Sequence, residues 1–440
     1  MILRTKYRKT AVIVAVSILY ILYYFSNGGG GDIEPAFQGS PSLKKTNTHF
    51  PEECKVVLSR ASEKHTIVMF LDQHNWLHLD INSDQCGNCE VTFDRSKITD
   101  PATKAVVFHF NQIDVKYLQK VRRLDQYYIW HSMESPLALR VVRGLSLDEY
   151  NNFFNLTMSY RDDSDIYYPY DTTENIRHLL DAKGSGDTNK DLDQLLRKKK
   201  KMALWVTSNC GTTSPARDRW IYSENLIKAG LELDRRGHCF PDAPRPPVRS
   251  ANNDQIWDDY ISEYKFYMAF ENSFNCLDYI TEKVFDNCLL HGAVPVVLGA
   301  KKSDYQKVIP TDSFIYAPDF KSPAELVKYL HYLDKNDSAY KQYFNWRVRD
   351  VKTMPNYGRA FGMCQLCRVL HGINVDNLFH PYYDQYYSDI PLCGYPKTTR
   401  IVTSIRNWFY GNDYNECHAN AHVLSVVQNW IASIWFYLWH

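Results

Sequence analysis

The most informative segment of this chain is Phe266-Tyr-Met-Ala-Phe-Glu-Asn-Ser-Phe-Asn-Cys-Leu-Asp-Tyr-Ile-Thr-Glu-Lys-Val-Phe285. Its first five residues are apolar and predict a buried strand, and the residues from Tyr279 to Leu290 have the spacing of a helix that ends at His291-Gly292. The next run, Ala293 to Leu298, is apolar without interruption, as is typical of a strand inside a parallel sheet. Polar side chains therefore gather at a strand-to-helix turn of an α/β layer.

The turn carries groups that suit a nucleotide. If Asp278 caps the helix, Glu282 and Lys283 fall in its first turns. Helix N-termini attract phosphate through free amide groups and the helix dipole, and Lys283 adds a cation. An acid at this place repels phosphate, so we expect Glu282 to accept hydrogen bonds from ribose hydroxyls. The alternative is an ordinary capped helix with a surface glutamate and lysine.

A second loop should lie beside this turn. Met202 to Thr207 reads as a strand, and Ala216 to Ala229 as a helix closed by Gly230. Ligands of open α/β sheets bind beyond the carboxyl ends of the strands. The loops that start at Ser208 and at Glu271 are therefore where we expect the chemistry.

The preceding part of the chain predicts another α/β layer. With 440 residues the chain is long enough for two domains. Short apolar runs predict strands, and Val115 to Arg123 is helix-like. We expect the chain to cross between the two lobes at Asp181 to Lys201, where charges and glycines are frequent. The predicted strands are Thr66 to Leu71, Ala105 to Phe110, Tyr127 to Trp130 and Phe154 to Tyr160.

The N-terminus reads as an uncleaved signal anchor. Arg4, Lys6, Arg8 and Lys9 precede the uncharged apolar run from Ala11 to Phe25. Basic residues on that side place the N-terminus in the cytosol and the rest of the chain in the lumen. A cleaved signal peptide is the alternative. The predicted parts are a cytosolic tail (1–9), a transmembrane helix (10–26), a stem (27–50), a first lobe (51–195), a second lobe (196–390) and a C-terminal extension (391–440).

Eleven cysteines agree with an oxidising compartment. The pairs Cys86/Cys89 and Cys364/Cys367 have the spacing of a split zinc site, but no histidine follows at finger spacing, so disulfides are favoured. The connectivity stays open, and the odd count leaves at least one thiol free or paired between chains. The sequons at Asn155 and Asn336 predict N-glycosylation in the lumen.

The charge balance argues against nucleic acid as the main partner, because 51 basic and 50 acidic residues leave a net charge of +1. Aromatic residues make up 14% of the chain, which is typical of proteins with amphipathic faces that stack on sugar rings. We therefore expect substrates that are recognised locally, and we expect most of the aromatic residues to fill the core and the surface.

The segment from Phe270 to Lys283 closely resembles the donor-binding signature of the α1,3-fucosyltransferases. That signature runs Phe-Glu-Asn-Ser, a short spacer, then Asp-Tyr-Ile-Thr-Glu-Lys; here five residues separate Ser273 from Tyr279, one more than usual. The resemblance covers about Val56 to His371. Further matching segments are Trp130-His-Ser-Met-Glu-Ser-Pro136, Asn155-Leu-Thr-Met-Ser-Tyr-Arg-Asp-Asp-Ser-Asp165, Trp205-Val-Thr-Ser-Asn209, Ala216-Arg217, Gly292 to Gly299 and Cys364-Gln-Leu-Cys367.

This resemblance implies a GT-B fold, with two Rossmann-like lobes facing a cleft, and an inverting transfer of fucose from GDP-fucose to GlcNAc. It implies that Glu134 is the general base and that Arg217 and Lys283 neutralise the departing diphosphate. It further implies a single-pass Golgi membrane protein that requires no cofactor, with stimulation by Mn or Mg left open. The remaining donor-binding residues that it implies are Ser208, Asn209, Asn272, Tyr279 and Glu282.

Two alternatives remain at this level. Asp163-Ser-Asp165 and Asp191-Leu-Asp193 fit the Asp-x-Asp pattern of metal-dependent glycosyltransferases, although a structural turn is the better interpretation of the first. A membrane lectin or chaperone could keep the fold and bind glycans without transfer. The tail from His418 to His440 lacks Asp, Glu, Lys and Arg, and reads as an interfacial helix, a second membrane span or an incorrect gene end.

Overall fold

The structure is a computed structural model that describes residues 63–71, 86–110, 113, 118, 120, 122–182, 189–211, 213–247, 254–348, 361–372, 402, 404–410 and 417. The predicted cytosolic tail, signal anchor and stem, and the uncharged segment 418–440, lie outside these residues. Within the described part, no helix combines the length and the hydropathy that crossing a membrane requires.

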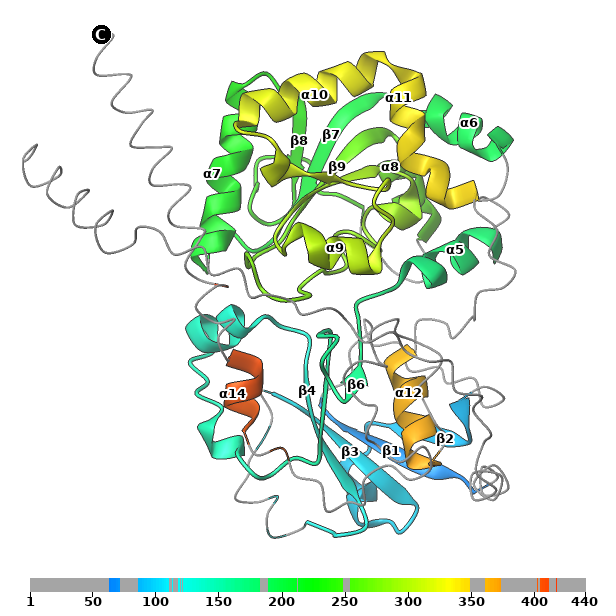
Figure 1. Ribbon diagram of the computed structural model, residues 1–440, viewed down its shortest axis with the longest axis vertical. Helices are drawn as coiled ribbons and strands as arrows, with labels where there is room; N and C mark the ends of the chain where they lie inside the picture. Colours follow the sequence, from blue (N-terminus) through cyan, green and yellow to red (C-terminus); the bar gives the residue numbers. More distant parts are fainter. Residues whose placement is uncertain are drawn as a thin grey trace, which may run out of the picture. The chain divides into compact units, whose positions relative to one another are not determined.

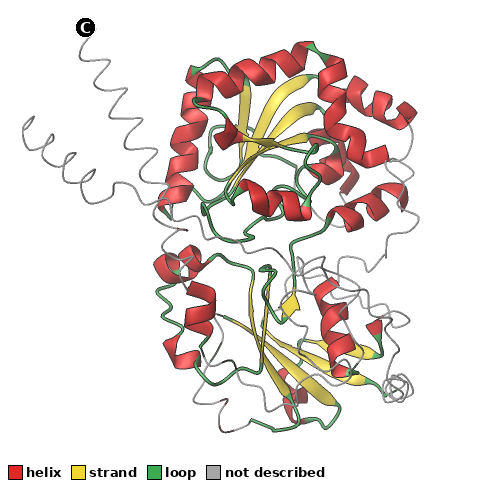
Figure 2. Cartoon of the chain, in the orientation of Figure 1, coloured by secondary structure: helices red, strands yellow, loops and turns green. Residues whose placement is uncertain are grey.

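The first half of the chain builds a six-stranded sheet in which all strands are parallel (Figures 1 and 2). Strand β1 is an example: five of its six residues are apolar or β-branched, and five are buried, as expected for a strand covered on both faces. The strand order is β2-β1-β3-β4-β5-β6. The strands are β1 (His65–Phe70), β2 (Cys89–Thr92), β3 (Thr103–His109), β4 (Tyr127–Ser132), β5 (Leu156–Ser159) and β6 (Ile166–Tyr167).

The second sheet has five parallel strands in the order β11-β10-β9-β7-β8. From β7 the chain first adds β8 on one side and then β9 on the other, so the order reverses between β7 and β9. Ligands of such sheets bind beyond the carboxyl ends of the strands at this reversal. The strands are β7 (Lys201–Val206), β8 (Leu233–Arg236), β9 (Tyr264–Phe270), β10 (Val294–Leu298) and β11 (Ile315–Tyr316).

Helices cover both faces of the second sheet. Alternate residues of β9 enter different apolar clusters: Phe266, Met268 and Phe270 pack with α7, α10 and α11, and Tyr267 and Ala269 pack with α5, α8 and α9. The α-helices are α5 (Thr173–Ala182), α6 (Asn189–Lys198), α7 (Ser214–Lys228), α8 (Asp254–Ser262), α9 (Lys302–Val308), α10 (Pro323–Lys335), α11 (Asp337–Lys341), α12 (Phe361–Leu370) and α14 (Ile405–Tyr410). Shorter turns are η1 (Arg95–Thr99), η2 (Ala138–Val142), η3 (Asp148–Tyr150), η4 (Leu289–His291), η5 (Ala317–Asp319) and η6 (Gln342–Val348).

The α/β fold with parallel sheets agrees with the sequence prediction, but four helices do not fit the predicted lobe ranges. Helix α6 begins in the predicted first lobe, yet its Leu192 is buried in a cluster of the second sheet. Helix α5 was expected in the first lobe (51–195), yet its Ile176 and Leu180 are buried in a cluster of the second sheet. Helix α12 was expected in the second lobe (196–390), and α14 in the extension (391–440), yet both pack on the first sheet. Sequence order alone does not reveal that the chain returns to an earlier core.

Disulfide bonds fix this return. Cys86 bonds Cys364 and Cys89 bonds Cys367, so the four cysteines are disulfide-bonded and offer no thiolate to zinc. His371 lies beside the second pair, but its neighbours are already oxidised. Two further bonds join Cys210 to Cys239 and Cys276 to Cys417, and among the described residues Cys288 is a free, buried thiol. Long-range crosslinks of this kind constrain the unfolded chain.

The predicted glycosylation at Asn155 is wrong for the folded chain. The Asn155 side chain is fully buried before β5, and its Oδ1 accepts a hydrogen bond from the Tyr128 backbone nitrogen at 2.7 Å. A glycan on this amide would have no room. Asn336 is partly exposed and caps α11 by accepting from the Ala339 nitrogen at 3.0 Å, so glycosylation there stays a prediction.

Candidate active site

The centre of the candidate site is a buried ion pair that follows β9. The Glu271 side chain is completely buried, and its carboxylate accepts hydrogen bonds from the Thr281 backbone nitrogen at 2.9 Å and the Thr281 hydroxyl at 2.8 Å. Lys283 Nζ lies 3.0 Å from Glu271 Oε2. Gly299, after β10, makes this arrangement possible, because a Cβ there would come within 2.7 Å of the Glu271 Cβ. Glu271 thus holds the segment that carries Lys283.

Lys283 is shared between two carboxylates. Besides Glu271, its Nζ contacts Glu282 Oε1 at 3.1 Å, and it donates to Thr281 Oγ1 at 2.7 Å. Burial disfavours the ammonium, but Glu271 and Glu282 outweigh this effect and raise the pKa of Lys283. The Lys283 side chain is 17% exposed and that of Glu282 is 42% exposed, so both reach the surface from an anchored base.

The predicted helix from Tyr279 to Leu290 is wrong. The segment forms consecutive turns with hydrogen bonds from residue i to i−5, for example Asn287 N to Glu282 O at 2.8 Å and Leu289 N to Val284 O at 2.9 Å, and only η4 at its end is helical. The apolar residues whose spacing predicted a helix are nevertheless buried together in one cluster. They are Ile280, Val284, Cys288 and Leu289. The structure therefore offers no helix dipole at this position for the predicted phosphate binding.

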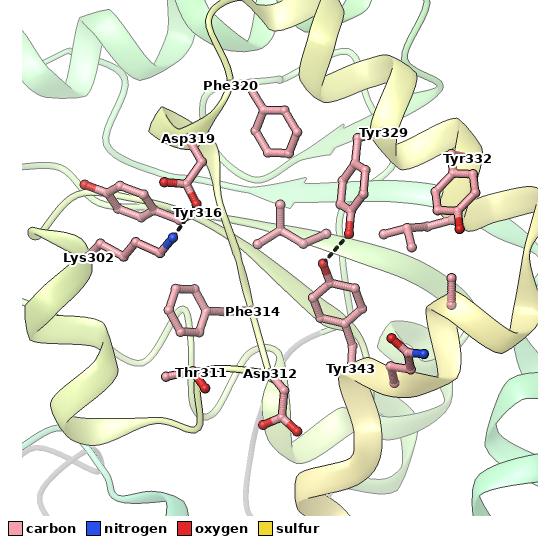
Figure 3. Close-up of a pocket in the computed structure, with 14 residues that line it drawn as sticks. Lys302, Thr311, Asp312, Phe314, Tyr316, Asp319, Phe320, Tyr329, Tyr332 and Tyr343 are labelled. Carbon is pink, nitrogen blue, oxygen red and sulfur yellow. Dashed lines mark hydrogen bonds and ion pairs between the residues drawn. The ribbon is translucent and has the colours of Figure 1, made fainter.

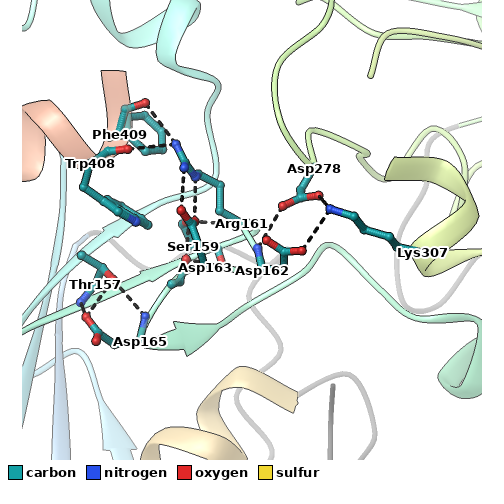
Figure 4. A network of polar contacts seen from close by, with 11 residues as sticks. Thr157, Ser159, Arg161, Asp162, Asp163, Asp165, Asp278, Lys307, Trp408 and Phe409 are labelled. Carbon is teal, nitrogen blue, oxygen red and sulfur yellow. Dashed lines mark hydrogen bonds and ion pairs between the residues drawn. The ribbon is translucent and has the colours of Figure 1, made fainter. Parts of the chain in front are cut away.

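Asp278, expected as the helix cap, has another role. Its φ of +55° is in the left-handed region, and its carboxylate accepts from the Asp162 backbone nitrogen at 3.1 Å. Its other oxygen lies 3.1 Å from Lys307 Nζ, which also contacts Asp162 Oδ2 at 3.1 Å (Figure 4). The residue before Tyr279 is thus tied to the turn that follows β5.

Tyr279 itself belongs to a group of buried tyrosines. Its ring centroid lies 5.1 Å from that of Tyr160 and 6.4 Å from that of Tyr170, and burial raises its pKa. The Tyr170 hydroxyl donates a hydrogen bond to the Met133 carbonyl, directly before Glu134. These rings connect the segment after β9 with the segment after β4.

Glu134 lies in that second segment. The Ser132 hydroxyl accepts from the Glu134 backbone nitrogen at 3.1 Å, and the Ser135 hydroxyl lies 2.6 Å from the Ser273 hydroxyl. Burial raises the pKa of the Glu134 carboxyl, and the nearby Lys283 ammonium partly opposes the shift. The structure therefore brings Glu134 together with the Glu271–Lys283 pair, and its raised pKa makes it a stronger base than an exposed glutamate.

The loop after β7 is organised by an arginine that the sequence analysis missed. Arg219 is 1% exposed, and its guanidinium donates to the Phe270 carbonyl at 2.7 Å, the Thr207 hydroxyl at 2.9 Å and the Asn209 carbonyl at 2.9 Å. It joins the ends of β7 and β9. The signal was present in the spacing, since Arg219 shares a helical stripe with the buried Ala216, Ser223 and Leu226.

The remaining predicted donor residues lie around this loop. Arg217 is exposed in the first turn of α7, and Ser208 is exposed just after β7. Thr213, which caps α7, donates to the Asn272 carbonyl at 2.8 Å. The Asn272 Oδ1 is buried and has no hydrogen-bond partner among the described residues, as expected for a group that meets a ligand.

The Asp-x-Asp pattern at Asp163 and Asp165 is structural. Asp165 is buried, and its Oδ2 accepts from the Thr157 nitrogen and hydroxyl at 2.8 and 2.9 Å. Asp163 pairs with Arg161 at 2.7 Å, which in turn donates to the Trp408 carbonyl of α14 (Figure 4). Asp193 forms an ion pair with Lys341 at 2.8 Å. The interpretation of Asp163-Ser-Asp165 as a structural turn is confirmed.

Comparison with known proteins gives a consistent assignment. The N-terminal fucosyltransferase family model matches residues 62–171, and the C-terminal model of glycosyltransferase family 10 (fucosyltransferase) matches residues 196–385. The 4-galactosyl-N-acetylglucosaminide 3-alpha-L-fucosyltransferase FUT6 of Pan troglodytes is 33% identical over 338 residues, which cover 74% of this chain and 84% of that protein.

Other similar proteins have related names. The 3-galactosyl-N-acetylglucosaminide 4-alpha-L-fucosyltransferase FUT3 of Bos taurus is 34% identical over 290 residues, which cover 64% of this chain and 69% of that protein. A crystal structure of an alpha1,3-fucosyltransferase aligns with a TM-score of 0.46 and 16% identity, covering 71% of this chain and 91% of that one. On the matches in sequence, this chain belongs to the fucosyltransferases of glycosyltransferase family 10.

Proposed function

We propose that this chain transfers L-fucose from GDP-fucose to a GlcNAc residue of a glycan, in α1,3 linkage and with inversion at the anomeric carbon. The observation that carries the proposal is the hydrogen bond between Ser135 and Ser273. Ser135 follows Glu134, whose pKa is raised, and Ser273 belongs to the segment that also carries Asn272, Glu282 and Lys283. A base on one side and a cation on the other are what a direct displacement needs.

In this mechanism Glu134 takes the proton from the acceptor hydroxyl as the oxygen attacks the anomeric carbon. The bond to the diphosphate breaks on the opposite face, so a β-linked donor gives an α-linked product without a covalent enzyme intermediate. Lys283 and the exposed Arg217 neutralise the charge that develops on the β-phosphate. Asn272, Tyr279 and Glu282 hold the nucleotide and the sugar, with Ser208 and Asn209 on the phosphate side.

Glu134→Gln tests the proposal. The variant should bind GDP-fucose as the wild type does, while turnover falls by about 10² to 10⁴-fold, the usual contribution of a general base. Glu149→Gln, at an exposed position in η3, is the matched control and should keep full turnover. Calorimetry measures donor binding, and release of GDP with a GlcNAc-terminated glycan measures turnover. Wild-type turnover in Glu134→Gln would remove the base assignment.

The linkage and the metal requirement have their own tests. Because both a 3-alpha- and a 4-alpha-fucosyltransferase match this chain at similar identity, NMR of the product decides the linkage. We propose α1,3 linkage to N-acetyllactosamine or to the innermost GlcNAc of N-glycans, and a panel of both acceptors separates the two. We propose that no metal is required, since cationic side chains meet the diphosphate; full activity in EDTA is the expected result.

We also propose that the chain is a single-pass type II protein of the Golgi membrane with a luminal catalytic body. The basic residues before the apolar run of 10–26 support this orientation. Protease protection of the body in sealed microsomes tests it, because a cytosolic body would be digested.

A further inference from the structure

A second site with carbohydrate-binding chemistry lies at the outer edge of the second sheet. A pocket of about 460 Å³ opens beside β11, between this edge strand and α10, α11 and η6 (Figure 3). Strand β10 separates it from β9, and none of the candidate active-site residues lines it. Its volume falls in the range of roughly 300 to 1,000 Å³ that is typical of small-molecule sites. Its aromatic lining residues are Phe314, Tyr316, Phe320, Tyr329, Tyr332 and Tyr343.

Three of the six aromatic rings, Phe320, Tyr329 and Tyr332, form a row along one side of the pocket (Figure 3). The centroids of Phe320 and Tyr329 are 5.4 Å apart, and those of Tyr329 and Tyr332 are 6.1 Å apart. The Tyr332 side chain is 52% exposed, although it is a large ring on the surface of α10. Phe320 and Tyr329 are partly buried and support Tyr332, whose exposed ring offers an apolar surface of the kind on which the C–H face of a sugar stacks.

Polar groups occupy the rest of the lining. Lys302 forms an ion pair with Asp319 at 2.6 Å, and the Tyr329 and Tyr343 hydroxyls are 2.8 Å apart. Asp312 and Gln342 add oxygen acceptors. One lysine against two aspartates leaves a formal charge of −1, which disfavours phosphates, nucleotides and acidic sugars. Hydroxyl groups of a neutral ligand can donate to these oxygens.

We propose that this pocket binds a neutral carbohydrate, as a glycan subsite separate from the one where fucose is transferred. The proposal that the carbohydrate is part of a glycan acceptor rests on the proposed function. The proposal that the pocket binds a neutral carbohydrate rests on its lining residues alone. When one branch of a glycan or glycoprotein binds this pocket, the effective concentration of its other branches at the active site increases. The pocket would then favour large neutral acceptors over short ones.

The direct test is a titration followed by methyl NMR. The probe is a neutral tetrasaccharide of two N-acetyllactosamine units, and the reporters are the methyl groups of Leu333 and Ala339, which line the pocket. We expect their resonances to shift with the probe and to shift less with its sialylated form. Shifts confined to Met133 and Thr281, near the active site, would overturn the proposal.

A variant makes the assignment specific. Tyr332→Ala should weaken the probe's affinity at Leu333 and Ala339 by roughly threefold to tenfold, the usual effect of losing one stacked ring. Ile256→Ala, which removes a side chain that is 53% exposed on α8, is the control and should leave affinity unchanged. Equal affinity in Tyr332→Ala would also overturn the proposal. Pocket shifts in a protein that transfers no fucose would instead contradict only the proposed function.

Discussion

Glu134 follows β4 of the first sheet and is partly buried, whereas Glu271 follows β9 of the second sheet and is completely buried; the two glutamates also have different partners. Glu271 is completely buried and is held by the Thr281 backbone and hydroxyl and by Lys283. In the part of the chain that is described, the Glu134 carboxylate has no hydrogen bond or ion pair. Burial raises the pKa of both carboxyls, but at Glu271 the hydrogen bonds from Lys283 and Thr281 oppose the shift. A glutamate with fixed partners organises a loop, and one without them can take up a proton.

The largest expected difference between Glu271 and Glu134 is the effect of their substitution on the free energy of unfolding. Glu271→Gln leaves the Lys283 ammonium with only the partly exposed Glu282 and weakens the hydrogen bonds from Thr281, so we expect the free energy of unfolding to fall by about 2 kcal/mol. Glu134→Gln removes a charge that burial disfavours, so it should change the free energy of unfolding by less than about 1 kcal/mol. Urea unfolding of both variants measures the difference, and equal losses would contradict the comparison.

The next largest effect concerns the donor. Lys283→Ala should weaken GDP-fucose binding by roughly 10-fold to 100-fold, because hydrogen bonds to charged groups contribute about 1.5 to 3 kcal/mol. Arg217→Ala should weaken it less, since Arg217 is exposed and its charge is screened by water. Lys201→Ala, an exposed lysine paired with Glu263, is the control. Calorimetry on folded proteins measures all three, and unchanged affinity in Lys283→Ala would remove the diphosphate role.

The pH dependence of catalysis sharpens the same contrast. A base works only when deprotonated, so kcat/KM should fall as pH decreases through the raised pKa of Glu134, above the value of about 4.3 for an exposed glutamate. In Lys283→Ala the opposing ammonium is gone, so the acid limb should move to higher pH. In Glu134→Gln the limb should disappear. An acid limb that persists in Glu134→Gln would belong to another group.

The sequence predicted the second sheet best. The apolar runs 266–270 in β9 and 294–298 in β10 are buried almost throughout, as their uninterrupted pattern predicts. The pairing of Glu271 with Thr281 and Lys283 could not be predicted, because an apolar spacing of three and four residues fits both a helix and the wider turns that form here. Arg219 was missed because a charged residue was assumed to be exposed.

The core of the first sheet was the least predictable part. Helices α12 and α14 come from the C-terminal third of the chain, and their contacts with the sheet are invisible to local patterns. The cysteines predicted as disulfides gave the only local indication of this return, since Cys364 and Cys367 bond residues 278 positions earlier. The connection between Glu134 and Lys283 was available only through resemblance to a family.

Lys307 links the segment before Tyr279, which follows the second sheet's strand β9, to the turn after β5 of the first sheet. Its ammonium contacts Asp278, directly before Tyr279, and Asp162, in the turn after β5. Burial disfavours this ammonium, but the two aspartates outweigh the effect and raise the pKa of Lys307. Burial, together with the neighbouring Asp162, raises the pKa of Asp278 to about 8. The Lys307 ammonium opposes both effects and so favours the ionised form of Asp278.

The smallest predicted effect follows from removing this ammonium. In Lys307→Ala the pKa of Asp278 should rise further, the turn at φ +55° should loosen, and Tyr279 should be held less well. We expect KM for GDP-fucose to increase by roughly 2-fold to 10-fold, since one charged contact is lost at a site about one-quarter exposed, and kcat to change little. Lys307→Arg should restore most of the affinity, and Lys341→Ala, which breaks an exposed ion pair with Asp193, should have no effect. If KM for GDP-fucose changes, Lys307 supports the donor-binding segment at Tyr279. If kcat alone changes, Lys307 acts instead on the segment that carries the base Glu134.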